Sequence, residues 1–292
     1  FAVFLFGLDE MLEKAGRSSI EKSRVLGPHL QPNDFGAFLA YSAGPFIGLF
    51  LMFWRNMKVW PVMPFFLLLL KLLLVTFSRG AMLGFLMGGA TAAWTRSIAY
   101  VATAIGIVIA IVLFAPQLLP ESVLARFKQT QTDDPGTTRK LDKSSDHRLI
   151  LWGAAIEMTK ESPIFGKGFK RFAEMKGQYT IQTVMESDTH NMYLYVSSQM
   201  GIPALILMLL IIFKIYWYGR TLYKYHPDSY AKAIGLGGAS MAAAVAVVNI
   251  FGSRIIGINT MGYVWIYLAI MSHLLVEIQT VGFNGVTKYG TK

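Results

Sequence analysis

Arginine and histidine residues stand beside the apolar blocks of this chain. Arg79 comes just before the apolar block Ala81–Trp94, Arg148 lies in a long polar segment, and His190 comes just before the apolar block Met192–Trp217. A guanidinium group binds phosphate oxygen atoms in pairs and keeps its charge at every relevant pH. An imidazole titrates near neutrality and accepts the proton of a hydroxyl group. These residue types indicate diphosphate binding and deprotonation of an alcohol.

His190 also has a structural interpretation, because it follows Glu186–Thr189 where the next helix is expected to begin. In that position it would cap the helix or lie at the membrane interface. His147, beside Arg148, is a weaker candidate for chemistry. The remaining histidines, His29, His226 and His273, are expected to be structural or solvated.

Several other kinds of chemistry lack a sequence signature. The chain has no phosphate-binding P-loop, no GxSxG or HExxH motif and no Asp-x-Asp pair suited to a sugar-nucleotide metal site. The nearest acidic pair, Asp133-Asp134, is followed by Pro135-Gly136 and resembles a loop tip. Cysteine is absent, which excludes a thiolate metal site or nucleophile. We therefore expect neither a metal nor a cofactor.

The composition is that of an integral membrane protein. Of the 292 residues, 54% are hydrophobic and 15% are charged, whereas a soluble domain has roughly 25% charged residues. The net charge of +10 is expected in short cytosolic loops beside acidic lipids rather than on a nucleic-acid surface.

Apolar blocks predict an all-α polytopic fold with seven full spans and one partial span, because about 20 apolar residues cross the bilayer core. The blocks are Phe1–Leu8, Phe35–Trp54, Val59–Phe77, Ala81–Trp94, Ile98–Ala115, Met192–Trp217, Ala231–Phe251 and Ile256–Val276. The short fourth block begins within Ser78-Arg79-Gly80 or belongs to a re-entrant element. The first residue lies inside an apolar run and is not Met, so we expect further spans upstream. Residues 1–115 and 191–292 are then membrane regions, and residues 116–190 form one long loop.

The lysine and arginine residues of the short loops predict the orientation. Arg55, Lys58, Arg96, Arg220, Lys224 and Lys232 fall on one side if the spans alternate, and that side should be the cytosol. The long loop then faces the periplasm. Arg24 and Arg254 join Arg79 and Arg148 on that outward side as candidate diphosphate ligands, while Lys167, Lys170 and Arg171 are expected to meet solvent or lipid head groups.

Within the long loop, the pattern predicts helices separated by polar linkers. The expected segments are an amphipathic helix Glu121–Gln129, a mobile stretch Thr130–Ser145, a helix His147–Glu161, a turn at Gly166-Lys-Gly168 and a short basic helix Phe169–Met175. Leu151, Ala154, Ala155 and Met158 share one side of the His147–Glu161 helix, so that side should be buried.

An ordered set of these motifs resembles the O-antigen ligase and polymerase superfamily. The motifs are Ser78-Arg79-Gly80-Ala81, Arg148-Leu-Ile-Leu-Trp152, Pro163-Ile-Phe-Gly166-Lys-Gly168-Phe169, His190-Asn191-Met192-Tyr193-Leu194 and Gly201. Upstream, Arg24-Val-Leu-Gly27-Pro28 and Pro32-Asn33-Asp34-Phe35 are similar to an outward loop of that family. The resemblance covers most of residues 24–201.

The resemblance implies a bacterial inner-membrane protein related to GT-C glycosyltransferases. Such proteins move a glycan from undecaprenyl diphosphate to lipid A-core, to a growing glycan or to a protein hydroxyl, without metal or sugar nucleotide. It also implies that Arg79 and Arg148 hold the lipid diphosphate and that His190 acts at the acceptor. The ligase, polymerase and protein O-oligosaccharyltransferase activities stay open.

Two other classes of function remain as alternatives. A transporter would place polar groups at the bilayer midplane, where this chain has only Lys71, and that residue could also extend to the interface. An accessory membrane subunit would not need arginine and histidine residues at the ends of its spans.

Overall fold

The computed structural model describes residues 2–14, 24–100, 102, 143–180 and 185–289, and these residues form helices and connecting loops without a strand. The α-helices are α1 (Ala2–Glu13), α3 (Pro32–Phe53), α4 (Met63–Val75), α5 (Arg79–Arg96), α8 (Lys143–Glu161), α9 (Phe172–Met175), α10 (Met192–Tyr225), α11 (Ser229–Val248) and α12 (Ile258–Tyr289). Short 3₁₀ segments cover Gly27–His29, Met57–Val62 and Lys176–Gln178. The predicted all-α fold is confirmed.

Five of the described helical segments are long and apolar enough to cross a membrane: Pro32–Phe53, Met57–Val75, Met192–Tyr225, Ser229–Val248 and Ile258–Ile278. The chain is therefore a polytopic membrane protein. Helix α5 has 18 residues and is less apolar than these five. The predicted span Ile98–Ala115 lies almost wholly outside the described residues, so the count of seven or eight spans stays a prediction.

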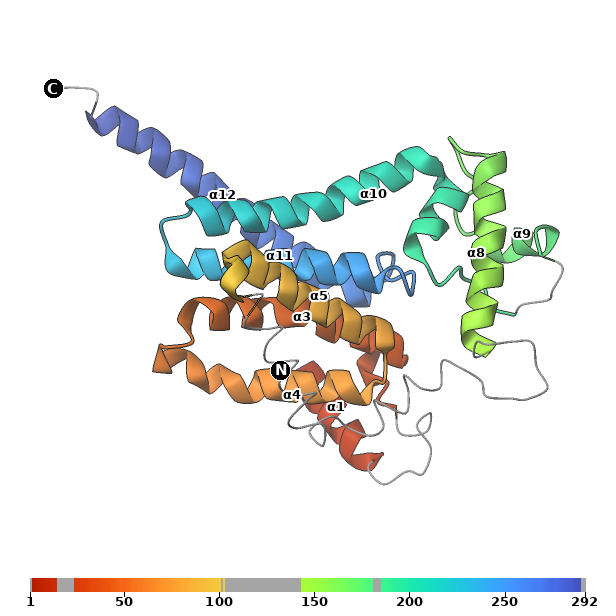
Figure 1. Ribbon diagram of the computed structural model, residues 1–292, viewed down its shortest axis with the longest axis horizontal. Helices are drawn as coiled ribbons and strands as arrows, with labels where there is room; N and C mark the ends of the chain where they lie inside the picture. Colours follow the sequence, from red (N-terminus) through yellow and green to blue (C-terminus); the bar gives the residue numbers. More distant parts are fainter. Residues whose placement is uncertain (1, 15–23, 101, 103–142, 181–184, 290–292) are drawn as a thin grey trace.

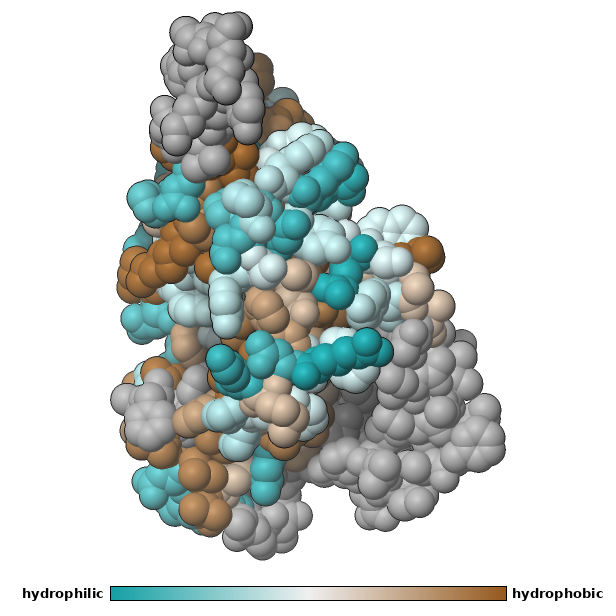
Figure 2. Space-filling model, turned by 90° about the vertical axis from the view of Figure 1, so that its left-hand side faces the viewer, coloured by the Kyte–Doolittle hydropathy of each residue, from teal (hydrophilic) through white to brown (hydrophobic). Residues whose placement is uncertain are grey.

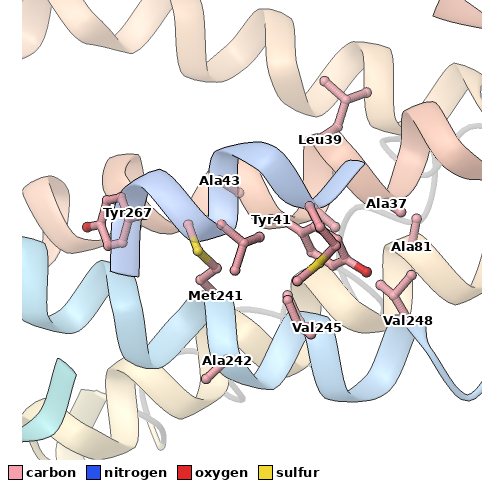
Figure 3. Packing of buried hydrophobic residues seen from close by; sticks show 14 of the residues in the cluster. Ala37, Leu39, Tyr41, Ala43, Ala81, Met241, Ala242, Val245, Val248 and Tyr267 are labelled. Atoms are coloured by element: carbon pink, nitrogen blue, oxygen red, sulfur yellow. The ribbon is translucent and has the colours of Figure 1, made fainter. Parts of the chain in front are cut away.

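Helix α11 forms the centre of the bundle and packs against α3, α5 and α10. Its neighbours approach closely because glycines lie at the contacts: a Cβ atom at Gly48 of α3 would fall 2.1 Å from the Ala233 carbonyl oxygen, and one at Gly84 of α5 would fall 2.4 Å from Val248 Cγ2. Small residues let membrane helices pack backbone to backbone. Tyr41 and Met241 fill the space between α3 and α11 (Figure 3).

Helix α10 is interrupted at Gly201, whose φ of +86° lies in the left-handed region, and Pro203 follows. The loop after α8 fills this break. The N–H groups of Lys167 and Gly168 donate to the carbonyl oxygens of Ser198 and Gln199 at 2.9 and 3.0 Å, and Ile202 N–H donates to Pro163 O at 2.7 Å. The loop therefore satisfies backbone groups that the interruption would otherwise leave without partners.

Helix α8 stands across one end of the bundle, beside the start of α10 (Figure 1). The four residues predicted to form its apolar side, Leu151, Ala154, Ala155 and Met158, are buried together with Phe172. The helix ends at Glu161, just before Ser162-Pro163, as predicted. It begins at Lys143, earlier than the predicted His147. The predicted helix Glu121–Gln129 and most of the stretch Thr130–Ser145 lie outside the described residues.

The predicted helix Phe169–Met175 is wrong at its start, because α9 begins at Phe172. Gly168 and Lys170 have φ values of +104° and +62°, and a right-handed helix cannot form through such residues. The predicted turn at Gly166-Lys-Gly168 is confirmed, since Gly166 also has a positive φ of +66°.

The cations assigned to the cytosolic loops lie on elements that meet at one end of the bundle. Arg96 contacts Met52 Sδ through its guanidinium group, and its carbonyl oxygen accepts a hydrogen bond from Tyr223 OH. The rings of Phe53 and Tyr230 lie 4.7 Å apart. Figure 2 views this end, where the α10–α11 turn lies, and hydrophilic side chains are spread across it. The predicted alternation of spans therefore agrees with the fold.

Candidate active site

His190 occupies a distinctive backbone position between the 185–189 loop and α10. Its φ of +52° is rare for a residue other than glycine. The N-cap of α10 is Asn191, whose Oδ1 accepts the N–H groups of Tyr193 and Leu194 at 3.0 and 3.2 Å. The helix therefore does not need His190 as its cap, and the imidazole remains available for other contacts.

Asp188 is the acidic neighbour of His190. Its Oδ2 lies 3.9 Å from His190 Nδ1, and its Oδ1 accepts a 2.8 Å hydrogen bond from Ser253 Oγ. This bond joins the loop before α10 to the loop after α11. Met192 N–H strengthens the same junction by donating to Asn249 O at 2.9 Å.

Burial lowers the pKa of His190 below its ordinary value of 6.5. The negative charge of Asp188 acts in the opposite direction, while the positive charges of Arg148 and Arg254 lower the pKa further. At neutral pH the imidazole is therefore uncharged and able to accept a proton. Hydrogen bonds bring both arginines to this loop: Ser253, the neighbour of Arg254, donates to Asp188, and Trp152, one turn from Arg148, donates to Thr189 O.

Helix α8 holds Arg148 near the 186–190 loop, because residues close to Arg148 on this helix contact the loop. His147 Nδ1 lies 3.0 Å from Glu186 Oε1, and Trp152 Nε1 donates to Thr189 O at 3.0 Å. The His147 contact also holds the pKa of Glu186 below its ordinary value. Arg148 and Trp152 are one turn apart, so the face of α8 that carries both residues is the face turned to the 186–190 loop.

Arg254 is fixed from two directions. Its backbone N–H donates to Asn249 Oδ1 at 2.9 Å, and its guanidinium group pairs with Asp34 and with Gln31 Oε1, the latter at 3.0 Å. Asn249 is fully buried and also donates to Tyr41 OH at 3.1 Å. The charge of Arg254 is thus partly neutralised by α3 before any ligand binds.

Arg79 is the first residue of α5 and lies at the same end of the bundle. A Cβ atom at the next residue, Gly80, would fall 2.9 Å from Phe251 Cβ, and Phe251 precedes Ser253 by two residues. Arg24 also lies near the start of this helix. Its Nε donates to Thr76 O at 2.9 Å and its Nη2 to Asn33 Oδ1 at 2.8 Å.

All five predicted site residues therefore lie at one end of the bundle, although they come from separate parts of the chain. Arg148, Arg254 and His190 act on one another electrostatically, whereas Arg79 and Arg24 are placed there through their neighbours. Sequence reasoning missed Asp188 and Asp34 as partners of His190 and Arg254. Asp34 is 220 residues from Arg254 in the sequence. Asp188 lies only two residues before His190, but the stretch Glu186–Thr189 was considered only as the segment that precedes the helix.

No cluster of three or more potential metal ligands occurs within the described ranges. The Asp133-Asp134 pair lies outside those ranges.

Comparison with known families identifies the chain. The model of the O-antigen ligase family matches residues 64–209, which is half of the sequence. The chain belongs to the O-antigen ligase family. The match runs from α4 to the first turns of α10 beyond Gly201, and it includes Arg79, Arg148 and His190. A search of curated proteins finds no match.

Membership in the O-antigen ligase family makes the chain an enzyme of the glycosyltransferase type, embedded in the membrane and associated with polysaccharide biosynthesis. Its partners are in general a lipid-linked glycan and an acceptor. The resemblance seen in the sequence motifs is confirmed at this level.

Proposed function

We propose that this chain transfers a glycan from undecaprenyl diphosphate to an acceptor hydroxyl group on the periplasmic side of the bacterial inner membrane. The observation that carries the proposal is the position of His190, which is partly buried beside Asp188. Its loop contacts the face of α8 that carries Arg148 and is bonded to Ser253, the neighbour of Arg254. The acceptor is lipid A-core, a growing glycan or a protein hydroxyl.

His190 acts as the base in this mechanism. Its Nδ1 faces Asp188 at 3.9 Å, which leaves Nε2 to take the proton of the acceptor hydroxyl. The acceptor oxygen forms a bond to the anomeric carbon as the bond between that carbon and the diphosphate oxygen breaks. The electron pair of the broken bond leaves with the lipid diphosphate.

Arg79 and Arg148 stabilise the leaving diphosphate. Preorganised positive groups are most effective where negative charge develops, and guanidinium groups supply that charge here without a metal ion. Arg24 and Arg254 already donate to protein oxygen atoms. We therefore assign these two residues to shaping the diphosphate site beside Arg79 and Arg148.

A transfer assay tests the proposal. Purified protein in vesicles should consume a polyprenyl-diphosphate-linked glycan and release the lipid diphosphate together with a glycosylated acceptor. Arg148→Lys should reduce transfer, because an ammonium group cannot reproduce the paired hydrogen bonds of a guanidinium group. The matched control is Lys160→Arg on the same helix, a residue paired with Glu157, which should leave transfer unchanged.

The alternatives predict different results. Movement of intact lipid-linked glycan across the vesicle membrane, without cleavage, would identify a transporter. Absence of both cleavage and movement, with activity restored only by a second membrane protein, would identify an accessory subunit.

A further inference from the structure

A polar cavity lies at the opposite end of the bundle from His190. Its volume is about 690 Å³, within the range of small-molecule sites. The walls come from the end of α3, the following turn and the end of α5. The lining residues are Met52, Phe53, Trp54, Arg55, Asn56, Met57, Arg96 and Tyr100.

Two guanidinium groups line this cavity, and each lies over an aromatic ring. The Arg55 Cζ atom is 4.8 Å from the centroid of the Trp54 ring, and the Arg96 Cζ atom is 4.7 Å from that of Tyr100. Stacking on a ring fixes the plane of a guanidinium group and leaves its N–H edge accessible.

Neither guanidinium group has a carboxylate partner among the residues that the structure describes. The side-chain hydrogen bond of Arg96 goes to Met52 Sδ at 2.9 Å, and a thioether is a weak acceptor. The nearby protein atoms therefore leave the positive charge of the cavity largely uncompensated. An anion that accepts several hydrogen bonds would satisfy it, and phosphate fits the paired geometry best.

The cavity also lies at the level of lipid head groups. Helix α3 ends at Phe53, and the turn that follows exposes Trp54, Met57 and Trp60 to 52%, 75% and 46%. Exposed tryptophans at the ends of spans mark the membrane interface. The cationic residues of this end indicate the cytoplasmic leaflet, which carries acidic lipids.

We propose that this cavity binds the phosphate head group of an anionic phospholipid. Arg55 and Arg96 hold the phosphate, and the exposed apolar side chains of the turn contact the start of the acyl chains. The site is separate from the proposed transfer site and does not depend on it. Free phosphate has the same chemistry, so the experiment must distinguish the two sources.

Lipid retention measures this site directly. The purified full chain is exchanged into mixed micelles containing equal amounts of phosphatidylglycerol and phosphatidylcholine, and retained lipid is counted by native mass spectrometry. We expect wild type to retain phosphatidylglycerol preferentially. The double variant Arg55→Gln/Arg96→Gln should retain at least tenfold less phosphatidylglycerol than wild type. The control Lys58→Gln/Lys232→Gln removes the same charge from the same end but substitutes no lining residue, and it should retain the lipid.

Two further measurements distinguish loss of the site from loss of folding, and a lipid from free phosphate. Arg55→Lys/Arg96→Lys preserves the charge and should show intermediate retention, so it provides the comparison if the glutamine variant does not fold. Millimolar inorganic phosphate should not displace the lipid. Equal retention in the cavity and control variants would overturn the site, and displacement by inorganic phosphate would overturn its assignment to a lipid.

Discussion

At the scale of single residues, the main feature is the balance of charge around His190. Burial and two arginines lower the pKa of its imidazole, and Asp188 partly opposes them. The lowered pKa favours the neutral, proton-accepting form of the imidazole, and the carboxylates of Asp188 and, to a smaller extent, Glu186 act in the opposite direction. The backbone conformation also fixes the position of His190. A residue other than glycine keeps a positive φ only when the surrounding structure stabilises it.

Asp188→Asn tests this balance through the pH dependence of transfer. Activity requires neutral His190, so the rate falls as the pH drops through the pKa of the imidazole. Removing the negative charge of Asp188 lowers that pKa further, and the acidic limb of the pH–rate profile should move to lower pH. Asparagine still accepts from Ser253, so the loop should remain in place.

The control for this profile is Glu157→Gln. It removes an exposed carboxylate of α8, which pairs with Lys160. Its acidic limb should coincide with that of wild type. A shift of the Asp188→Asn limb to higher pH would contradict the assignment of His190 as the base.

At the scale of elements, the central contact is between the Pro163–Gly168 loop and the break in α10. The motif Pro163–Phe169 and Gly201 were both recognised in the sequence, but as separate features. Their contact could not be predicted, since it depends on how α8 crosses the end of the bundle. The start of α9 was missed for a related reason: nothing in the residue type of Lys170 signals its positive φ.

Gly201→Ala should destabilise the protein. A Cβ atom at this position would fall 2.0 Å from Ile164 O, and the φ of +86° adds strain of about 1–3 kcal/mol. Thermal unfolding in detergent should show a clearly lower midpoint. We expect transfer to decrease in parallel, because the loop also helps to position α8 and therefore Arg148.

Gly153→Ala is the matched control for this substitution. It lies within α8 and a Cβ atom there would meet nothing within 4 Å, so alanine should stabilise the helix by about 0.5–1 kcal/mol. Equal midpoints for the two variants would show that the loop does not hold the break in α10.

At the scale of the whole molecule, the two ends of the bundle carry different polar chemistry. The end that holds His190 combines arginine, histidine and aspartate, and the opposite end carries arginine and lysine with exposed aromatic rings. The apolar blocks predicted most helices, and the loops that the Lys/Arg pattern assigned to the cytosol lie at one end of the bundle. The sequence did not predict that Arg254 pairs with Asp34, because 220 residues separate them and the pairing arises from the packing of α3 on α11.

Thiol labelling in intact cells tests which end faces outward. The chain has no native cysteine, so single cysteines report their own position. Glu174→Cys, at an exposed site in α9, should react with a thiol reagent that crosses the outer but not the inner membrane. Ser229→Cys, at the exposed start of α11, should react only after the inner membrane is permeabilised. The reverse pattern would invert the proposed topology.

The most direct test of the account separates donor binding from turnover in His190→Ala. If His190 accepts the acceptor proton, its removal should lower the transfer rate by about 10²- to 10⁴-fold, while binding of the polyprenyl-diphosphate-linked glycan stays close to wild type. His273→Ala, a change at an exposed residue of α12, should leave both quantities unaltered. Full transfer activity in His190→Ala, or a loss of donor binding as large as the loss of rate, would contradict the assignment of His190 as the catalytic base.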